Sequence, residues 1–179
     1  MNKFLLSVFL LTSVSAYAQH YLPIDDGSKL HFVIKNIGIN TGGDISGLQG
    51  KIVFDAKNTA KCFFDVTVAT KTIDTDNGKR DEHLRKKEYF DVAAYPVIRL
   101  MSTKIEPGAD LKHFIFKGNL TIKNITKQVT FPFTAESKNG GAFFNGSFEI
   151  NRLDFGVGKE SFSLSKKLSV TLNAFAKAQ

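Results

Sequence analysis

The sequence of 179 residues is poor in cysteine, tryptophan and proline. It contains one cysteine, no tryptophan and four prolines. A single cysteine excludes an internal disulfide, so a chain of this length has to fold on its hydrophobic core alone. Cys62 is in phase with Phe64, Val66 and Val68 in an alternating run. That position favours a small buried apolar residue over a reactive thiol.

Catalytic and metal-binding signatures are missing as well. His20, His31 and His113 are scattered without the spacing of metal ligands, and no serine or cysteine nucleophile motif accompanies them. The pattern predicts a protein that is not an enzyme and that uses no metal or other cofactor.

Basic residues exceed acidic ones, and they are spread along the chain. The formal net charge is +7, and no basic stripe is interleaved with aromatic residues, which argues against nucleic acid as a partner. A moderate positive charge suits transient contact with an anionic membrane surface, and it also serves solubility alone. A second copy of the chain, as in a homodimer, is a further alternative that the sequence leaves open.

The first eighteen residues have the organisation of an export signal. Lys3 gives a positive start, residues 4–14 form an apolar run, and Ala16-Tyr17-Ala18 matches a small-x-small cleavage site. The run is shorter than the ~20 residues that span a bilayer, and no cysteine follows the site to carry a lipid anchor. We therefore predict a signal peptide at 1–18, a mature chain that begins at Gln19, and one domain at 19–179 located in the periplasm or outside the cell.

Eight runs in the mature chain alternate apolar and polar residues, which is the period of a β-strand with one buried face. Mostly short connections with turn residues favour antiparallel pairing. A sheet with one apolar face must close into a barrel or fold into a sandwich, and the length of several runs favours the barrel. We predict an all-β, eight-stranded antiparallel lipocalin-like barrel. The runs are residues 29–36, 48–55, 62–70, 97–104, 112–123, 128–136, 144–150 and 167–174.

The connection between the third and fourth runs, residues 71–96, is far longer than a hairpin needs. Asp81 and Glu82 precede the basic residues 85–87, which is the charge order that a helix dipole favours. This predicts a short capping helix across one end of the barrel. Arg80, Asp81 and His83 would then lie near the mouth, where they either bind an anionic head group or only fix the cap.

Phenylalanine dominates the predicted inward faces. Two interpretations are open: the aromatic side chains pack as a solid core, or they surround an elongated apolar tunnel about 25 Å tall that takes a lipid chain. The residues predicted to line the tunnel are Phe64, Val66, Val68, Phe114, Phe116, Leu120, Phe131, Phe133, Phe144, Phe148, Val170 and Leu172.

Several blocks of the sequence resemble the YceI-like family. The blocks are residues 47–55, 72–75, 79–84, 89–91, 95–96, 118–127 and 151–158. The resemblance implies an exported, lipocalin-like barrel that holds a polyisoprenoid or fatty-acyl lipid, for carriage or sequestration across the periplasm. Residues 36–43 depart from the family, because many members have a histidine-containing segment there, and Asn124 stands where a glycine is usual. The first departure leaves the chemistry of the mouth open.

The rival interpretation is a solid-core stress or scaffold protein that acts through its outer surface. A lipid-modifying enzyme is a third and more distant alternative.

Overall fold

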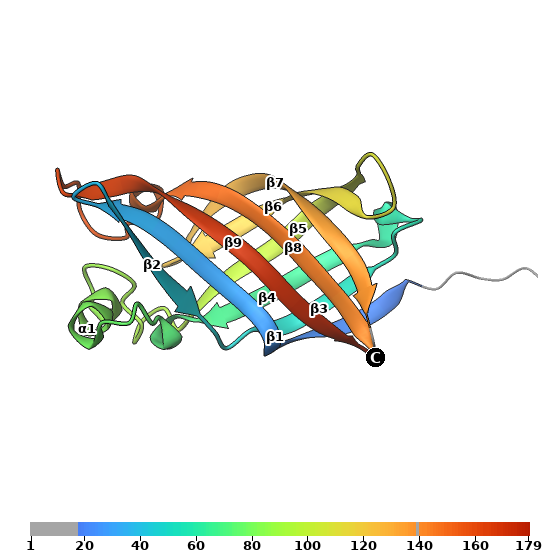
Figure 1. Cartoon of the computed structure of the whole chain (residues 1–179), viewed down its shortest axis with the longest axis horizontal. Helices are drawn as coiled ribbons and strands as arrows, with labels where there is room; N and C mark the ends of the chain where they lie inside the picture. The colour runs from blue at the N-terminus through green and yellow to red at the C-terminus, as the bar shows by residue number, and fades with distance from the viewer. Residues whose placement is uncertain (1–17, 139) are drawn as a thin grey trace, which may run out of the picture.

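Nine strands and one short α-helix make up the described part of the protein, residues 18–138 and 140–179 of a computed structural model (Figure 1). The helix α1 spans Gly78–Arg85, and the 3-10 turns are η1 (Thr59–Lys61), η2 (Thr70–Thr72) and η3 (Arg152–Phe155). The strands are β1 (Gln19–Asn36), β2 (Ile39–Ile45), β3 (Gln49–Phe54), β4 (Phe63–Ala69), β5 (Val97–Pro107), β6 (His113–Ile122), β7 (Ile125–Lys138), β8 (Gly141–Asn151) and β9 (Leu164–Ala178).

The sheet closes on itself because β1 has neighbours on both edges. One edge pairs with β9. The other edge pairs with β3 near the start of β1 and with β2 near its end. β2 and β3 run in the same direction, one after the other along β1, and together they fill one position of the barrel. The prediction of an eight-stranded antiparallel barrel with one short helix is confirmed.

Two features of the first strands were not predicted. β1 begins at Gln19 rather than Lys29 and carries an irregularity in its pairing with β9 between Ile24 and Lys29. β2 was missed because its sequence, INTGGDI, does not alternate. Its glycines have a packing reason: a Cβ on Gly43 would lie 2.6 Å from the Phe32 ring and 2.7 Å from the methyl group of Thr75. Pairing with β1 therefore makes this segment a strand despite its weak intrinsic pattern.

The segment between β4 and β5 covers one end of the barrel, as predicted. Asn77 caps α1, since its side chain accepts a hydrogen bond from the backbone N–H of Arg80 at 3.1 Å. Arg85 in the last turn donates to the carbonyls of Lys71 at 3.0 Å and Ile73 at 2.9 Å. Asp74 forms a two-bond bridge with Asp44 on β2. These contacts fix α1 across the end of the barrel (Figure 1).

Aromatic rings fill the opposite end of the barrel. Phe54 lies 5.0 Å from Phe114 and 5.3 Å from Phe144 between ring centroids, and Phe64 lies 5.6 Å from Phe133, all close to edge-on. Such pairs add about 0.5–1.5 kcal/mol each beyond the burial of area. The end of the barrel opposite α1 is therefore a packed aromatic core.

One prediction concerns a residue at the margin of this core. Cys62 is half-buried against the aromatic cluster, and burial raises the pKa of its thiol above the ordinary value.

The predicted signal peptide lies outside the described residues apart from Ala18, so it stays a prediction. No helix within 18–138 and 140–179 is long and apolar enough to cross a bilayer.

Candidate functional site

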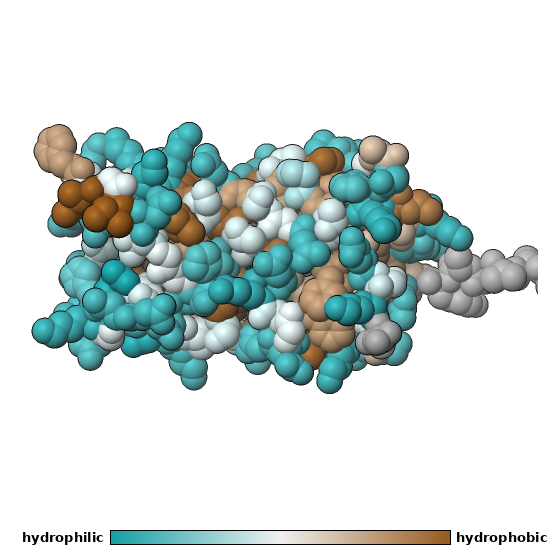
Figure 2. All heavy atoms as spheres, in the orientation of Figure 1, coloured by the Kyte–Doolittle hydropathy of each residue, from teal (hydrophilic) through white to brown (hydrophobic). Residues whose placement is uncertain are grey.

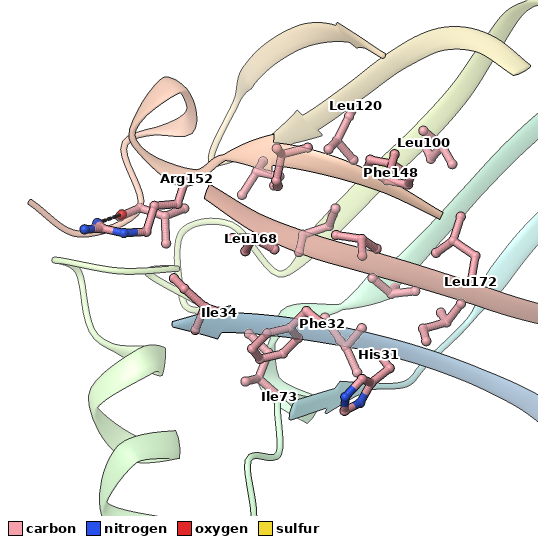
Figure 3. A pocket seen from close by; sticks show the side chains of 18 of the residues that line it. His31, Phe32, Ile34, Ile73, Leu100, Leu120, Phe148, Arg152, Leu168 and Leu172 are labelled. Atoms are coloured by element: carbon pink, nitrogen blue, oxygen red, sulfur yellow. Dashed lines mark hydrogen bonds between the residues drawn. The ribbon is translucent and has the colours of Figure 1, made fainter. Parts of the chain in front are cut away.

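A cavity of about 480 Å³ occupies the end of the barrel that carries α1. Its walls are mainly aliphatic and aromatic side chains from the strands, and the connections that follow β4 and β8 complete them. Figure 3 shows Phe32 and Ile34 from β1, Phe148 from β8 and Leu168 from β9 directed towards one space. A volume of this size is in the usual range for small-molecule sites.

Eleven of the twelve residues predicted to line an apolar tunnel do line this cavity. They come from β4, β6, β7, β8 and β9, so the alternation in these strands identified the inward face correctly. The eleven are Phe64, Val66, Val68, Phe116, Leu120, Phe131, Phe133, Phe144, Phe148, Val170 and Leu172. That these residues bind a ligand stays a prediction.

Phe114 is the exception. It is fully buried and packs against Phe54 and Phe133, with ring centroids 5.0 and 5.5 Å apart, in the filled end of the barrel. Phe116, two residues further along the same strand face, does reach the cavity and stacks on Phe131 at 4.8 Å. Alternation assigns both side chains to the interior, but only their height along the barrel decides which one meets open space.

The cavity has a floor. Phe64, Phe133 and Phe144 line the end of the cavity that is farthest from α1. Tyr21 and Phe54 lie beyond these three rings and line a second, smaller pocket of about 230 Å³ at the opposite end of the barrel. The two pockets are separated by these rings. Each of the two interpretations, packed core and apolar void, therefore describes one half of the interior.

The other end of the cavity opens to solvent. Lys159, Ser161 and Ser163 are exposed and also line the cavity, as does the exposed His83. From the cap, Leu84 and Tyr89 contribute apolar surface at the same level. A ligand can therefore enter between the cap and the connection from β8 to β9.

The three predicted polar residues of the mouth have different positions. Arg80 and His83 line the cavity, whereas Asp81 does not. The Nε of Arg80 donates to the Thr75 hydroxyl at 2.7 Å, and a second guanidinium nitrogen donates to the Thr75 carbonyl. Asp81 is buried, and its carboxylate accepts from the Thr75 backbone N–H at 3.0 Å and from its hydroxyl. Asp81 thus fixes the cap, and the His83 ring packs on Tyr89 at 4.8 Å.

Arg152 is a functional candidate that the sequence reasoning missed. It begins η3, is only 2 % exposed, and lines the cavity (Figure 3). Its guanidinium donates to the carbonyls of Ser165 at 2.9 Å, Val157 at 2.8 Å and Lys159 at 2.8 Å. Burial lowers the pKa of Arg152 from its ordinary value. Backbone carbonyls rather than a carboxylate accept its hydrogen bonds, so the positive charge is solvated by dipoles and not neutralised.

The charged residues of the cavity wall are basic. Arg80, Arg152 and Lys159 line it together with His31 and His83, and no aspartate or glutamate of the described chain does. His31 has its own partner, because its ring nitrogen is paired with Asp44. The described residues contain no cluster of histidine, cysteine, aspartate or glutamate suited to a metal ion.

Inward residues of β1 and β9 were also missed as wall residues. Leu30, Phe32 and Ile34 alternate along β1, and Leu168 is in phase with Val170 and Leu172 on β9. Their alternation was visible in the sequence, although it was not used to select them. Three further wall residues, Ile73, Tyr89 and Val157, lie in connections, where no strand periodicity predicts which side chains face inward.

Comparison with known proteins agrees with this architecture. The model of the YceI-like domain matches residues 23–176. The chain belongs to the YceI-like family. A UPF0312 protein of Yersinia enterocolitica is 31% identical over 159 residues, which is 84% of this chain and 82% of the relative.

Solved structures of low sequence identity share the fold of this YceI-like protein. BcnA from Burkholderia cenocepacia has a TM-score of 0.78 at 23% identity, covering 84% of this chain and 96% of BcnA. A domain from Saccharophagus degradans, described as polyisoprenoid-binding, has a TM-score of 0.70 at 13% identity, covering 92% of this chain and all of the domain. At these identities the likeness establishes the fold alone.

Proposed function

We propose that this YceI-like protein is an exported binding protein that holds one long apolar ligand, an isoprenoid or fatty-acyl lipid, without turning it over. The observation that carries the proposal is the apolar cavity of about 480 Å³ with an aromatic floor and an open mouth. The description of the Saccharophagus degradans domain as polyisoprenoid-binding supports the same ligand class.

The volume sets the length of chain that the cavity accepts. At about 30 Å³ for each water-sized group, a cavity of about 480 Å³ holds about sixteen such groups. That is a saturated chain of about sixteen carbons or about three isoprene units. A longer polyisoprenoid would leave its remaining units outside the mouth.

Energetics favour a carrier over a permanent store. Burying ~400 Å² of lipid tail gains ~10 kcal/mol relative to water at ~25 cal/mol per Å². A bilayer offers the tail a similar gain, so the net preference between cavity and membrane is small. Near balance permits both loading and unloading, which carriage across the periplasm requires.

The charges at the cavity wall favour a ligand with a carboxylate or phosphate head. Arg80, Arg152 and Lys159 contribute positive charge to the wall, and among the described residues no carboxylate lines it to compete with an anionic head group. Guanidinium groups form the stronger, charge-assisted hydrogen bonds with carboxylate and phosphate oxygens. A neutral amide or alcohol would leave that preference unused.

Native mass spectrometry of the exported chain, purified without detergent, tests the proposal. We expect a fraction that carries one lipid, and stoichiometric uptake of added palmitate or farnesyl phosphate by the empty fraction. Farnesol and palmitamide, which have the same tails and uncharged heads, serve as matched controls and should bind more weakly. If no lipid co-purifies and none of the four is taken up, the proposed function is wrong.

A further inference from the structure

Three large apolar side chains project into solvent beside the mouth of the cavity. Ile37 is 76% exposed, Ile39 is 70% exposed and Phe162 is fully exposed. Ile37 lies in the β1–β2 turn, Ile39 begins β2, and Phe162 lies in the β8–β9 connection. The turn and the connection contact each other, because the N–H of Ile37 donates to the carbonyl of Ser163 at 2.6 Å. Figure 2 shows hydrophobic atoms gathered at this end of the molecule. We call Ile37, Ile39 and Phe162 the apolar tip.

Folding does not account for the residue at the centre of the apolar tip. Ile37 has a φ of 50° and is followed by Gly38 with a φ of 76°. A two-residue hairpin turn with both φ values positive favours asparagine, aspartate or glycine, and a β-branched residue is an outlier there. Ile37 is strained and packs against little, so neither the turn nor the core explains an isoleucine at this position.

The apolar tip is continuous with the cavity. Asn36, which precedes Ile37, lines the cavity, and so do Ser161 and Ser163 on either side of Phe162. Whatever surface the apolar tip contacts is therefore brought against the opening through which a ligand passes.

Lysines surround the apolar tip. Segments 35–39 and 159–167 carry Lys35, Lys159, Lys166 and Lys167, all exposed, against a single acidic residue, Glu160. Glu160 is paired with Lys166, and Lys167 lies 4.0 Å from the carboxylate of Glu149 on β8. Within 18–138 and 140–179, Lys35 and Lys159 form no ion pair. Exposed apolar side chains bordered by lysine are the composition of an interfacial membrane contact.

We propose that the apolar tip inserts into the head-group region of an anionic phospholipid bilayer and so places the mouth of the cavity on the membrane. The lysines meet the lipid phosphates, and a tail passes between bilayer and cavity without crossing water. This role in exchange rests on the proposed function, although the docking itself does not require a ligand.

A second copy of the chain fits the apolar tip less well than a bilayer does. A large aromatic side chain buries about 150–250 Å², so three side chains stay below the ~800 Å² per partner that a stable dimer buries. Segments 35–39 and 159–167 contain four lysines and one glutamate, so two copies of this surface would repel each other.

Vesicle flotation with the exported chain tests the docking surface. The vesicles contain phosphatidylethanolamine with phosphatidylglycerol, and phosphatidylcholine vesicles provide the uncharged comparison. Ile37→Asn suits the turn better than isoleucine and should not lower the melting temperature, and Phe162→Ser removes a side chain that packs on nothing. Leu111→Ser is the matched control, because Leu111 is 58% exposed at the opposite end of the barrel.

We expect wild type to float with the anionic vesicles and to bind less at high salt. Each substitution in the apolar tip should weaken binding about tenfold, since a fully buried aliphatic or aromatic side chain is worth at least that factor. The double variant should lose about a hundredfold, and Leu111→Ser should bind as wild type does.

Three results would overturn the docking surface: no flotation of wild type, equal flotation of the double variant, or self-association that depends on the apolar tip and replaces vesicle binding. Uptake of a fluorescent fatty acid in free solution is measured in parallel. Flotation without uptake would contradict the proposed function and leave the docking surface standing. Uptake without flotation would contradict the docking surface and leave the proposed function standing.

Discussion

The floor of the cavity predicts a limit on ligand length that a single substitution should move. Leu172 on β9 lines the cavity and packs against the aromatic cluster below it, so its side chain lies at the deep end. Tryptophan in its place adds about six non-hydrogen atoms. Of the roughly sixteen water-sized groups that the cavity holds, Leu172→Trp should therefore remove the space for about six.

The measurable consequence is a change in how affinity depends on chain length. Each methylene that enters the cavity contributes about 0.8 kcal/mol, or about fourfold in affinity. For a series of saturated fatty acids, the wild-type affinity should rise to about sixteen carbons and then level off. In Leu172→Trp it should level off near ten carbons, with unchanged affinity for shorter chains.

Displacement of a fluorescent fatty acid measures the series, and Leu111→Trp, outside the cavity, is the control. Because the added atoms extend into the cavity and away from the aromatic cluster on which Leu172 packs, the melting temperature should change little. An affinity in wild type that keeps rising well beyond twenty carbons, or the same plateau in both proteins, would show that the floor does not limit ligand length.

Three further changes test the cap, the mouth and the outer surface. Asp81→Ala leaves the N–H of Thr75 unpaired under the cap and should lower the free energy of unfolding by about 1–3 kcal/mol in urea titrations. Arg152→Met removes the donors from several backbone carbonyls and should cost about 3 kcal/mol or more by the same measurement. Hydrogen bonds from Arg99 hold the pKa of Asp65 below its ordinary value. This exposed pair should contribute under about 1 kcal/mol to the free energy of unfolding. The contribution should be fully present above the unfolded pKa of about 3.9 and should be lost as the pH falls through the lower pKa of the folded state. The stabilities of wild type and Asp65→Asn, measured as a function of pH, should therefore converge towards about pH 2.

Alternation in the sequence was enough to predict the barrel, but it did not predict where the barrel is empty. Phe114 and Phe116 share a strand face, yet one is in the packed end and the other lines the cavity. Strand tilt and stagger set the height of each residue in a closed barrel, and neither can be read from a period of two. The depth of the cavity therefore required coordinates.

Residues of the connections were the hardest to predict. Arg152 looks like an ordinary charged residue in the sequence, and its burial depends on three carbonyls from the loop after η3 and from the start of β9. The strand β2 was hidden for a similar reason, because Gly42 and Gly43 fit against β1 and the cap rather than following a pattern of their own. Asp81 was predicted at the mouth because it follows Arg80 in the same short helix. Consecutive residues of a helix do not lie on the same face, so the position of Arg80 at the cavity did not extend to Asp81.

A crystal structure of the chain from Gln19 onward with bound palmitate or farnesyl phosphate tests the central claim most directly. We predict one tail that runs from the floor formed by Phe64, Phe133 and Phe144 to the opening beside the cap, with the head group next to Arg80 or Arg152. Density confined to the outer surface, or a cavity filled by its own rings with no tail inside, would contradict it.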